Sequence, residues 1–170
     1  MNRIKNIKLL FCLSLINLIR FPALFRVKSL LLKSIGIKVG KNVKVAGKVY
    51  LTSSNIIIGD NVWLGDDIRI YCTDSGSVEL GSNIDIGPNV TICTGTHEIG
   101  NANRRAGKGY TEGIIIEDGC WIGIGSLILN GSHIGKGSII SARSTIKGNI
   151  DVNTLVKREK PTKVKIREVN

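Results

Sequence analysis

Residues 116–152, IEDGCWIGIGSLILNGSHIGKGSIISARSTIKGNIDV, decide the fold. An aliphatic residue recurs at every sixth position, at Ile116, Ile122, Ile128, Ile134, Ile140, Ile146 and Val152. Small residues fall four positions after most of these, at Cys120, Ser126, Ser132, Ser138 and Ser144. Because the two series are an even number of positions apart, both face inward on short strands that are separated by corners. Three such strands per coil would stack aliphatic side chains about 4.8 Å apart in a β-solenoid.

The same period continues towards the N-terminus in three shorter blocks. Their members are Val39, Val45 and Leu51, then Ile58, Leu64 and Ile70, then Leu80, Ile86 and Ile92. Beyond Ile92 a period of six would place Glu98 and Arg104 in the core, so we predict that residues 98–113 form a loop extruded from the solenoid. Such a loop is usually where function resides. Glycine just after the aliphatic residue, as at Gly87, is expected to supply flexibility at the corners, and the count of twenty glycines indicates many positive-φ positions.

The net charge of +11 is carried by the first 50 residues. They contain eleven Lys and Arg and no acidic residue, whereas the other 13 basic residues are balanced by all 13 acidic ones. These cations alternate with Leu and Ile rather than with aromatic residues. This pattern favours an anionic membrane surface over nucleic acid as a partner.

The chain is predicted to divide into three parts. Residues 1–36 would form two short amphipathic helices broken at Pro22, residues 37–156 the β-helix domain, and residues 157–170 a basic tail. The helices could cap the open end of the solenoid, contact a membrane through residues 1–35, or do both.

A cytoplasmic location is expected from two features. The apolar run over residues 9–19 is too short to span a bilayer, which needs about 20 residues, and no cleavage site of the signal-peptide kind follows it. The four cysteines show neither CxxC pairing nor zinc-finger spacing, which fits reduced thiols.

The sequence resembles the left-handed β-helix acyltransferases, in the branch that includes maltose, galactoside and xenobiotic acetyltransferases. The resemblance covers roughly residues 39–164, and it rests on the hexapeptides and three further elements. These are Gly95-Thr96-His97 before the loop, IEDGCWIG at residues 116–123 after it, and ISARS at residues 140–144. It implies an all-β, left-handed parallel coil and a homotrimer with active sites between subunits. The implied reaction is acetyl transfer from acetyl-CoA to a sugar, as in surface-polysaccharide biosynthesis.

Acetyl transfer to a hydroxyl needs a general base, commonly histidine, and a donor for the thioester oxyanion. His97 is the candidate base. The resemblance implies that the oxyanion donor lies just after Trp121, at Gly123 or Ile124. The contacts that it implies for acetyl-CoA are Trp121, Gly123, Ile124, Ala142, Lys147 and Lys163. Lys147-Gly148-Asn149 stands where the family has Thr-Lys-Asp, one position out of phase.

The acceptor side is expected to use Asp67 and Asp74, whose carboxylates suit sugar hydroxyls, although Asp is also common at corners for conformational reasons. Arg104 in the loop would hold an anionic acceptor or the neighbouring subunit. The second histidine, His133, is expected to face outward, either as a surface residue or on the substrate side. No Ser or Cys is obviously paired with a base, so direct transfer without a covalent enzyme intermediate is expected.

Three other functions compete with sugar O-acetylation. An N-acetyltransferase acting on an amino sugar or nucleotide-amino sugar would use the same base and donor. A non-catalytic β-helix scaffold would give no reason for His97 and Trp121. A γ-class carbonic anhydrase shares the fold but needs three histidine ligands, and the sequence has two, so no metal is expected.

Overall fold

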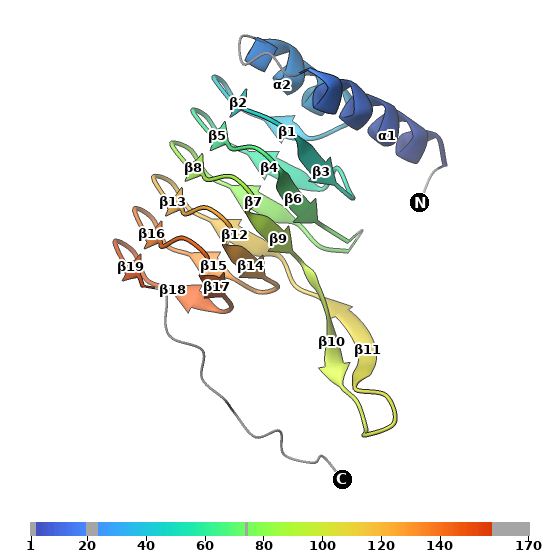
Figure 1. Ribbon diagram of the computed structural model, residues 1–170, viewed down its shortest axis with the longest axis vertical. Coiled ribbons are helices and arrows are strands. Elements are labelled where there is room, and N and C mark those ends of the chain that lie inside the picture. Colours follow the sequence, from blue (N-terminus) through green and yellow to red (C-terminus); the bar gives the residue numbers. More distant parts are fainter. Residues whose placement is uncertain (1–2, 20–23, 74, 158–170) are drawn as a thin grey trace.

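The structure, a computed structural model, describes residues 3–19, 24–73 and 75–157. Two helices, α1 (Arg3–Leu18) and α2 (Phe25–Ser34), lie across one end of a solenoid of short parallel strands (Figure 1). Each coil has three sides, and strands that stack along one side form one sheet. The solenoid is the predicted left-handed parallel β-helix, with about six turns.

The three sheets follow one another around each coil. The first sheet contains β1 (Lys38–Val39), β4 (Ile56–Ile58), β7 (Val78–Leu80), β12 (Ile114–Ile116), β15 (His133–Ile134) and β18 (Asn149–Ile150). The second contains β2 (Lys44–Val45), β5 (Trp63–Leu64), β8 (Asp85–Ile86), β13 (Trp121–Ile122), β16 (Ile139–Ile140) and β19 (Leu155–Val156). The third contains β3 (Val49–Leu51), β6 (Ile68–Tyr71), β9 (Thr91–Cys93), β14 (Leu127–Leu129) and β17 (Thr145–Ile146). We call the turns from first to second, second to third and third to first sheet the first, second and third corners.

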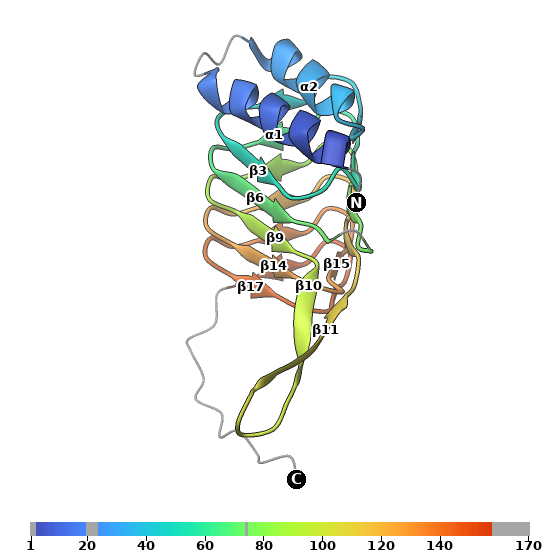
Figure 2. The same ribbon diagram turned by 90° about the vertical axis from the view of Figure 1, so that its right-hand side faces the viewer.

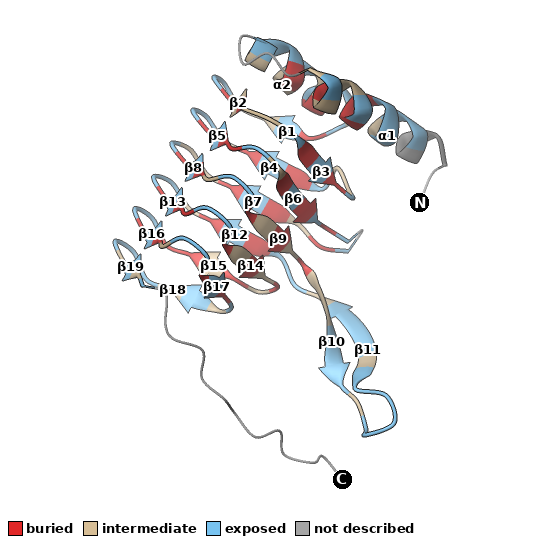
Figure 3. Cartoon of the chain, viewed as in Figure 1, coloured by how far each residue is buried: buried red, intermediate tan, exposed pale blue. Residues whose placement is uncertain are grey.

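The core is the predicted stack of aliphatic side chains. Ile116 pairs in register with Ile134, and Ile122 pairs with Ile140, and all four are fully buried. Burying each such side chain stabilises the fold by about 1.5–3 kcal/mol. The small series also faces inward, and the buried hydroxyl of Ser138 donates to the carbonyl of Asp151 at 2.8 Å. Figure 3 shows buried residues along the inside of the coils and exposed ones along the corners.

One position of the aliphatic series was predicted wrongly. Val152 is 59% exposed, and Ile150 pairs with Ile134 in its place. The third corner after Ile146 is therefore two residues shorter than the period of six requires. Gly148 makes this tighter turn possible because it adopts a φ of +88°, which glycine reaches at little steric cost.

The corner glycines that follow the aliphatic residues allow close packing of successive coils. Gly87 is not a positive-φ residue; a Cβ there would lie 2.8 Å from the backbone nitrogen of Ile124 in the next coil. The position needs glycine because the two backbones approach so closely. The positive φ falls two residues later, at Asn89, where it is +56°. Asn tolerates this conformation because its short polar side chain bonds locally.

The two helices cap the first coil, as the sequence suggested. Asn17 donates to the carbonyl of Val49 at 3.1 Å and accepts from its N–H at 2.9 Å, so it pairs with the edge strand as another strand would. Lys28 is buried and donates to the carbonyl of Gly47 at 2.9 Å. Burial lowers the pKa of this amine, and the carboxylate of Asp66 opposes that shift.

Two predictions about this segment have different outcomes. The expected break at Pro22 lies outside the described residues. Among the helices that the structure describes, none is long and apolar enough to cross a bilayer.

The extruded segment is an ordered β-hairpin rather than an irregular loop. Its strands are β10 (Gly95–Ile99) and β11 (Ala106–Thr111), which pair antiparallel. The hairpin leaves the third corner between β9 and β12 and projects away from the solenoid (Figures 1 and 2). At its base the hydroxyls of Thr73 and Thr111 lie 2.8 Å apart, which ties the hairpin to the preceding coil.

Candidate active site

His97 lies on β10 with its side chain exposed. Its Nδ1 is 3.0 Å from the carbonyl oxygen of Gly107 on β11. A carbonyl oxygen only accepts, so in the neutral ring Nδ1 carries the proton and donates it. The lone pair is then on Nε2, which is the nitrogen left to take a proton from another molecule. This is the tautomer that a general base needs.

The local backbone aims this ring. Register shifts between His97 and Ile99, and such a bulge redirects the side chains beside it. A Cβ at Gly107 would lie 2.9 Å from the carbonyl oxygen of Glu98, so a larger residue would push the strands apart. Gly109 is the register partner of His97, and a Cβ there would lie 3.6 Å from the imidazole Cε1. The contact at Gly109 would be an ordinary one, so it is Gly107 that brings the acceptor of the imidazole close.

The corner after Trp121 offers one free backbone donor. Trp121 is exposed on the outside of β13. The N–H of Gly123 donates to the carbonyl of Ile140 at 2.8 Å, so it is not available to an oxyanion. The N–H of Ile124 makes no hydrogen bond within the part of the chain that the structure describes. Of the two residues expected to supply the oxyanion donor, only Ile124 keeps an N–H for that role.

Ala142 lies directly against this second corner in the next coil. A Cβ at Gly123 would lie 2.5 Å from the Ala142 nitrogen, and Arg143 N–H donates to the Ile124 carbonyl at 2.8 Å. The side chains of Ile124 and Ala142 are both exposed. The structure thus brings these predicted acetyl-CoA contacts together as one apolar strip.

Within one chain this strip is remote from His97. The strip is at the second corner, whereas His97 lies beyond the third, at the other end of the third-sheet strands. The third-sheet strands that separate these two corners are two to four residues long, and each strand residue adds about 3.3 Å. Lys147 follows β17 at the third corner, two coils beyond the base of the hairpin. Lys163 lies outside the described residues.

The predicted acceptor residues do not converge. Asp67 lies at the second corner with a φ of +55°, and its carboxylate is 2.9 Å from the Arg69 guanidinium. The equivalent positions of the second corner in later coils, such as Asn89 and Gly125, also have positive φ. The conformation of the corner alone therefore accounts for an Asp at this position. Arg104 lies in the turn at the tip of the hairpin, where its N–H donates to Asn101. Asp74 is outside the described residues.

His133 faces outward from β15, as expected, and has a partner that the sequence did not suggest. Its Nε2 is 2.7 Å from Oε1 of Glu117. The other carboxylate oxygen of Glu117 accepts from the N–H of Lys136 at 2.8 Å. The contact with His133, followed by that with Lys136, holds the pKa of Glu117 below its usual value. The sheet register places both side chains on the outer face of the first sheet.

A buried thiol offers no alternative nucleophile. Cys120 is buried, and its Sγ lies 3.3 Å from the carbonyl of Gly135. Burial raises the pKa of the thiol, so it stays protonated at neutral pH and is a poor nucleophile. Cys120 is therefore not a candidate for a covalent intermediate.

Sequence reasoning missed Gly107 as the partner of His97. The alternation Gly107-Lys108-Gly109 is a signal that could have revealed it, because two glycines on one strand often mark a close approach of another group. Pairing them with His97 would still have required the register of the hairpin.

Comparisons with known proteins agree with this fold. The family model "Bacterial transferase hexapeptide (six repeats)" matches residues 113–148. The chain is 32% identical over 133 residues to WcaF of Escherichia coli (strain K12), covering 78% of this chain and 70% of that protein. The assignment of WcaF as a colanic acid biosynthesis acetyltransferase is itself provisional.

Two further relatives have names that state an activity or a ligand. The galactoside O-acetyltransferase of Escherichia coli (strain K12) is 36% identical over 141 residues, covering 82% of this chain and 68% of that protein. A solved structure of a galactoside acetyltransferase in complex with coenzyme A superposes with a TM-score of 0.75 and 28% identity. It covers 89% of this chain and 74% of the other. The protein therefore belongs to the hexapeptide-repeat acetyltransferase family, and it is an enzyme of that class.

Proposed function

We propose that the protein transfers the acetyl group of acetyl-CoA to a hydroxyl of a sugar, with His97 as the general base. The observation that carries this proposal is the 3.0 Å contact between His97 Nδ1 and the Gly107 carbonyl, which leaves Nε2 as the proton acceptor. The hydroxyl proton passes to Nε2 while the hydroxyl oxygen bonds to the thioester carbonyl carbon. The carbon–sulfur bond then breaks, and the CoA sulfur takes up the proton.

The thioester carbonyl oxygen gains negative charge in this reaction and needs a fixed donor. The free N–H of Ile124 suits that role, and the exposed strip of Ile124 and Ala142 suits the thin pantetheine arm. Trp121 and Gly123 flank this strip. Lys147 and Lys163 would bind the phosphates of CoA as point charges.

We infer that the site is completed between subunits of a homotrimer. The support for this is the separation of His97 from the strip at the second corner, which a single chain does not bridge. The projecting hairpin would carry His97 to the strip of the neighbouring copy. Arg104 at its tip, Asp67 and Asp74 remain proposed contacts to the acceptor or to that copy.

A sugar acceptor is supported by the names of the relatives, which include a galactoside and a polysaccharide pathway. We propose surface-polysaccharide precursors in the cytoplasm as the acceptor class. The test is release of free CoA when the purified protein is mixed with acetyl-CoA and a panel of galactosides, glucosides, amino sugars and nucleotide-amino sugars. A product ester that hydroxylamine cleaves supports O-acetylation, whereas a resistant amide would establish N-acetylation instead. No CoA release with any acceptor would refute both.

The shared site can be tested by mixing two inactive variants. His97→Ala removes the base, and Ala142→Glu blocks the exposed strip without disturbing the core. If the two positions serve one site from different subunits, trimers reassembled from both variants recover activity at some interfaces. If one chain supplies both, the mixture stays inactive. Val152→Ala, exposed and outside the site, is the control for reassembly.

A further inference from the structure

The outer faces of the two capping helices carry large exposed apolar residues. On α1, Leu13 and Ile16 are buried against the solenoid, and Ile7, Phe11 and Leu18 lie on the opposite face. On α2 the buried side carries Leu32 and Lys28, and the exposed side combines Val27 and Leu30 with Arg26 and Lys33. The large apolar residues exposed on the cap are 41% to 75% accessible: Ile7, Leu10, Phe11, Leu18, Leu24, Val27 and Leu30. The two helices α1 and α2 pack side by side over the end of the solenoid (Figures 1 and 3).

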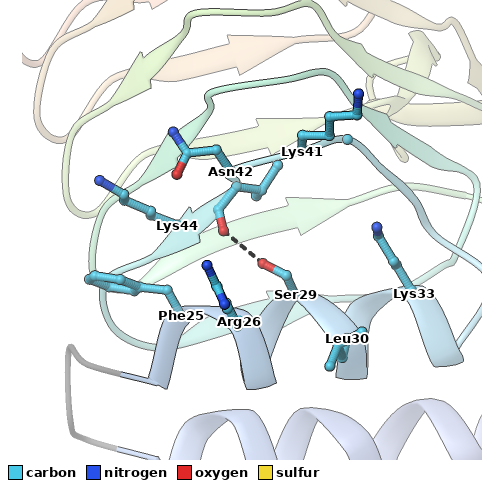
Figure 4. A pocket seen from close by; sticks show the side chains of 10 residues that line it. Phe25, Arg26, Ser29, Leu30, Lys33, Lys41, Asn42 and Lys44 are labelled. Atoms are coloured by element: carbon cyan, nitrogen blue, oxygen red, sulfur yellow. Dashed lines mark hydrogen bonds between the residues drawn. The ribbon is translucent and has the colours of Figure 1, made fainter.

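Beside this apolar face is a cationic cleft. It lies between α2 and the turn from β1 to β2, and has a volume of about 570 Å³. Figure 4 shows Arg26 and Lys33 on the helix, Lys41 in the facing turn and Lys44 at the start of β2. No carboxylate is among the residues that line the cleft. Ser29 is already used, because its hydroxyl donates to the Val43 carbonyl at 2.7 Å.

Among the residues that the structure describes, no carboxylate forms an ion pair with these cations. The first 50 residues contain no acidic residue, and the first two in the following coils are Asp60 and Asp66. Oδ1 of Asp60 accepts from the backbone N–H of Lys41 at 2.7 Å, and Oδ1 of Asp66 accepts from that of Lys48 at 2.7 Å. Both carboxylates are thus engaged with backbone rather than with the side chains of the cleft.

An apolar helical face flanked by cations is the pattern of a helix that lies in the interface of an anionic bilayer. Leu30 is on the outer face and also lines the cleft, so the two features are continuous. We propose that this helical cap docks on an anionic phospholipid surface. Its exposed Leu, Ile and Phe side chains enter the boundary between headgroups and acyl chains, and Arg26, Lys33, Lys41 and Lys44 bind lipid phosphates. This proposal goes beyond the acetyl transfer and does not depend on it.

The test is flotation of the full-length protein with vesicles of phosphatidylcholine alone or with added phosphatidylglycerol. Wild-type protein is expected to float only with the anionic vesicles, and to be released as the salt concentration rises. Each cation near an anionic membrane surface raises the affinity for it roughly fivefold. The double variant Arg26→Glu/Lys33→Glu should therefore weaken vesicle binding by more than about tenfold. Leu10→Glu with Phe11→Glu should do the same through the apolar face.

Matched controls are taken from distant parts of the chain. Lys108→Glu in the hairpin removes a cation, and Val152→Glu adds an acid at an exposed apolar position in the last coil. Both should bind as wild type does. The salt dependence of the wild-type protein requires no variant, so the proposal remains testable if a cap variant misfolds.

Three results would overturn the proposal. The first is wild-type protein that floats with no vesicle, or equally with neutral and anionic ones. The second is cap variants that bind as well as the controls. The third is a change in the sedimentation mass of the cap variants without a change in flotation, which would show that the face is a contact between copies.

Discussion

The Nδ1 atom of His97 and the carbonyl oxygen of Gly107, on facing strands of the projecting hairpin, lie 3.0 Å apart. The bond spans the hairpin at the bulge that follows His97. It selects the tautomer of the imidazole and restricts the rotation of the ring. Hydrogen bonds of this kind orient a catalytic histidine. The acceptor fixes the proton on one ring nitrogen, so the other nitrogen is free to accept a proton from the substrate.

Replacing His97 should abolish most of the activity and leave the fold intact. A positioned general base contributes about 10²–10⁴ in rate, so His97→Gln is expected to lower kcat by a factor in that range. The side chain is exposed, so the melting temperature should change little. Steady-state CoA release measures the loss of activity, and thermal unfolding of the same preparation shows whether the fold is intact. Full activity of the variant would exclude His97 as the base.

Gly107→Ala should act through the position of His97. Its Cβ would meet the Glu98 carbonyl oxygen at 2.9 Å, so β11 must shift and the acceptor of Nδ1 moves with it. We expect a fall in kcat of about tenfold or more, with a smaller change in the KM for acetyl-CoA. Lys108→Ala, on the same strand, is the control. A kcat that falls only in step with the melting temperature would indicate that Gly107 is only structural.

The inward register predicts a large difference between neighbouring residues of β12. Ile116 is fully buried in the stack, and Ile115 faces outward. Ile116→Ala should therefore reduce the free energy of unfolding by about 2–5 kcal/mol, and Ile115→Ala by much less. Urea denaturation of both variants measures the difference. Equal losses would contradict the register.

Glu117 should make a contribution to stability that disappears in acid. Its contacts with His133 and Lys136 favour the ionised form, so its pKa in the folded protein is below the ordinary 4.5. The stabilisation is complete above that value, and it is lost as the pH falls below 4.5 through the lowered pKa. Glu117→Gln is expected to lower the melting temperature at neutral pH, with the difference from wild type shrinking in strong acid.

The control for this comparison is Glu79→Gln, on the same outer face of the first sheet. If the melting temperature of Glu117→Gln were below that of wild type by the same amount at every pH, the ionised carboxylate would not be the source of the lost stability.

Repetition made most of the coil predictable. Each aliphatic residue has an inward position that depends only on its place in the sequence, as at Ile122 and Ile128. The prediction failed at Val152, because an aliphatic residue stands at the sixth position although Gly148 has shortened the corner before it. The number of residues in a corner depends on backbone dihedral angles, which cannot be read from the spacing of hydrophobic residues.

The sequence by itself determined the solenoid, the point at which it is interrupted, and the identity of the histidine beside that interruption. These follow from the alternation of side chains along short strands, which is a local property. The tertiary structure decided which group holds His97, and which of the two predicted donors after Trp121 remains free. It also decided that His97 and Ile124 lie at different corners of one chain. Such relationships join residues that are distant in sequence, and they depend on strand register and on the stacking of successive coils.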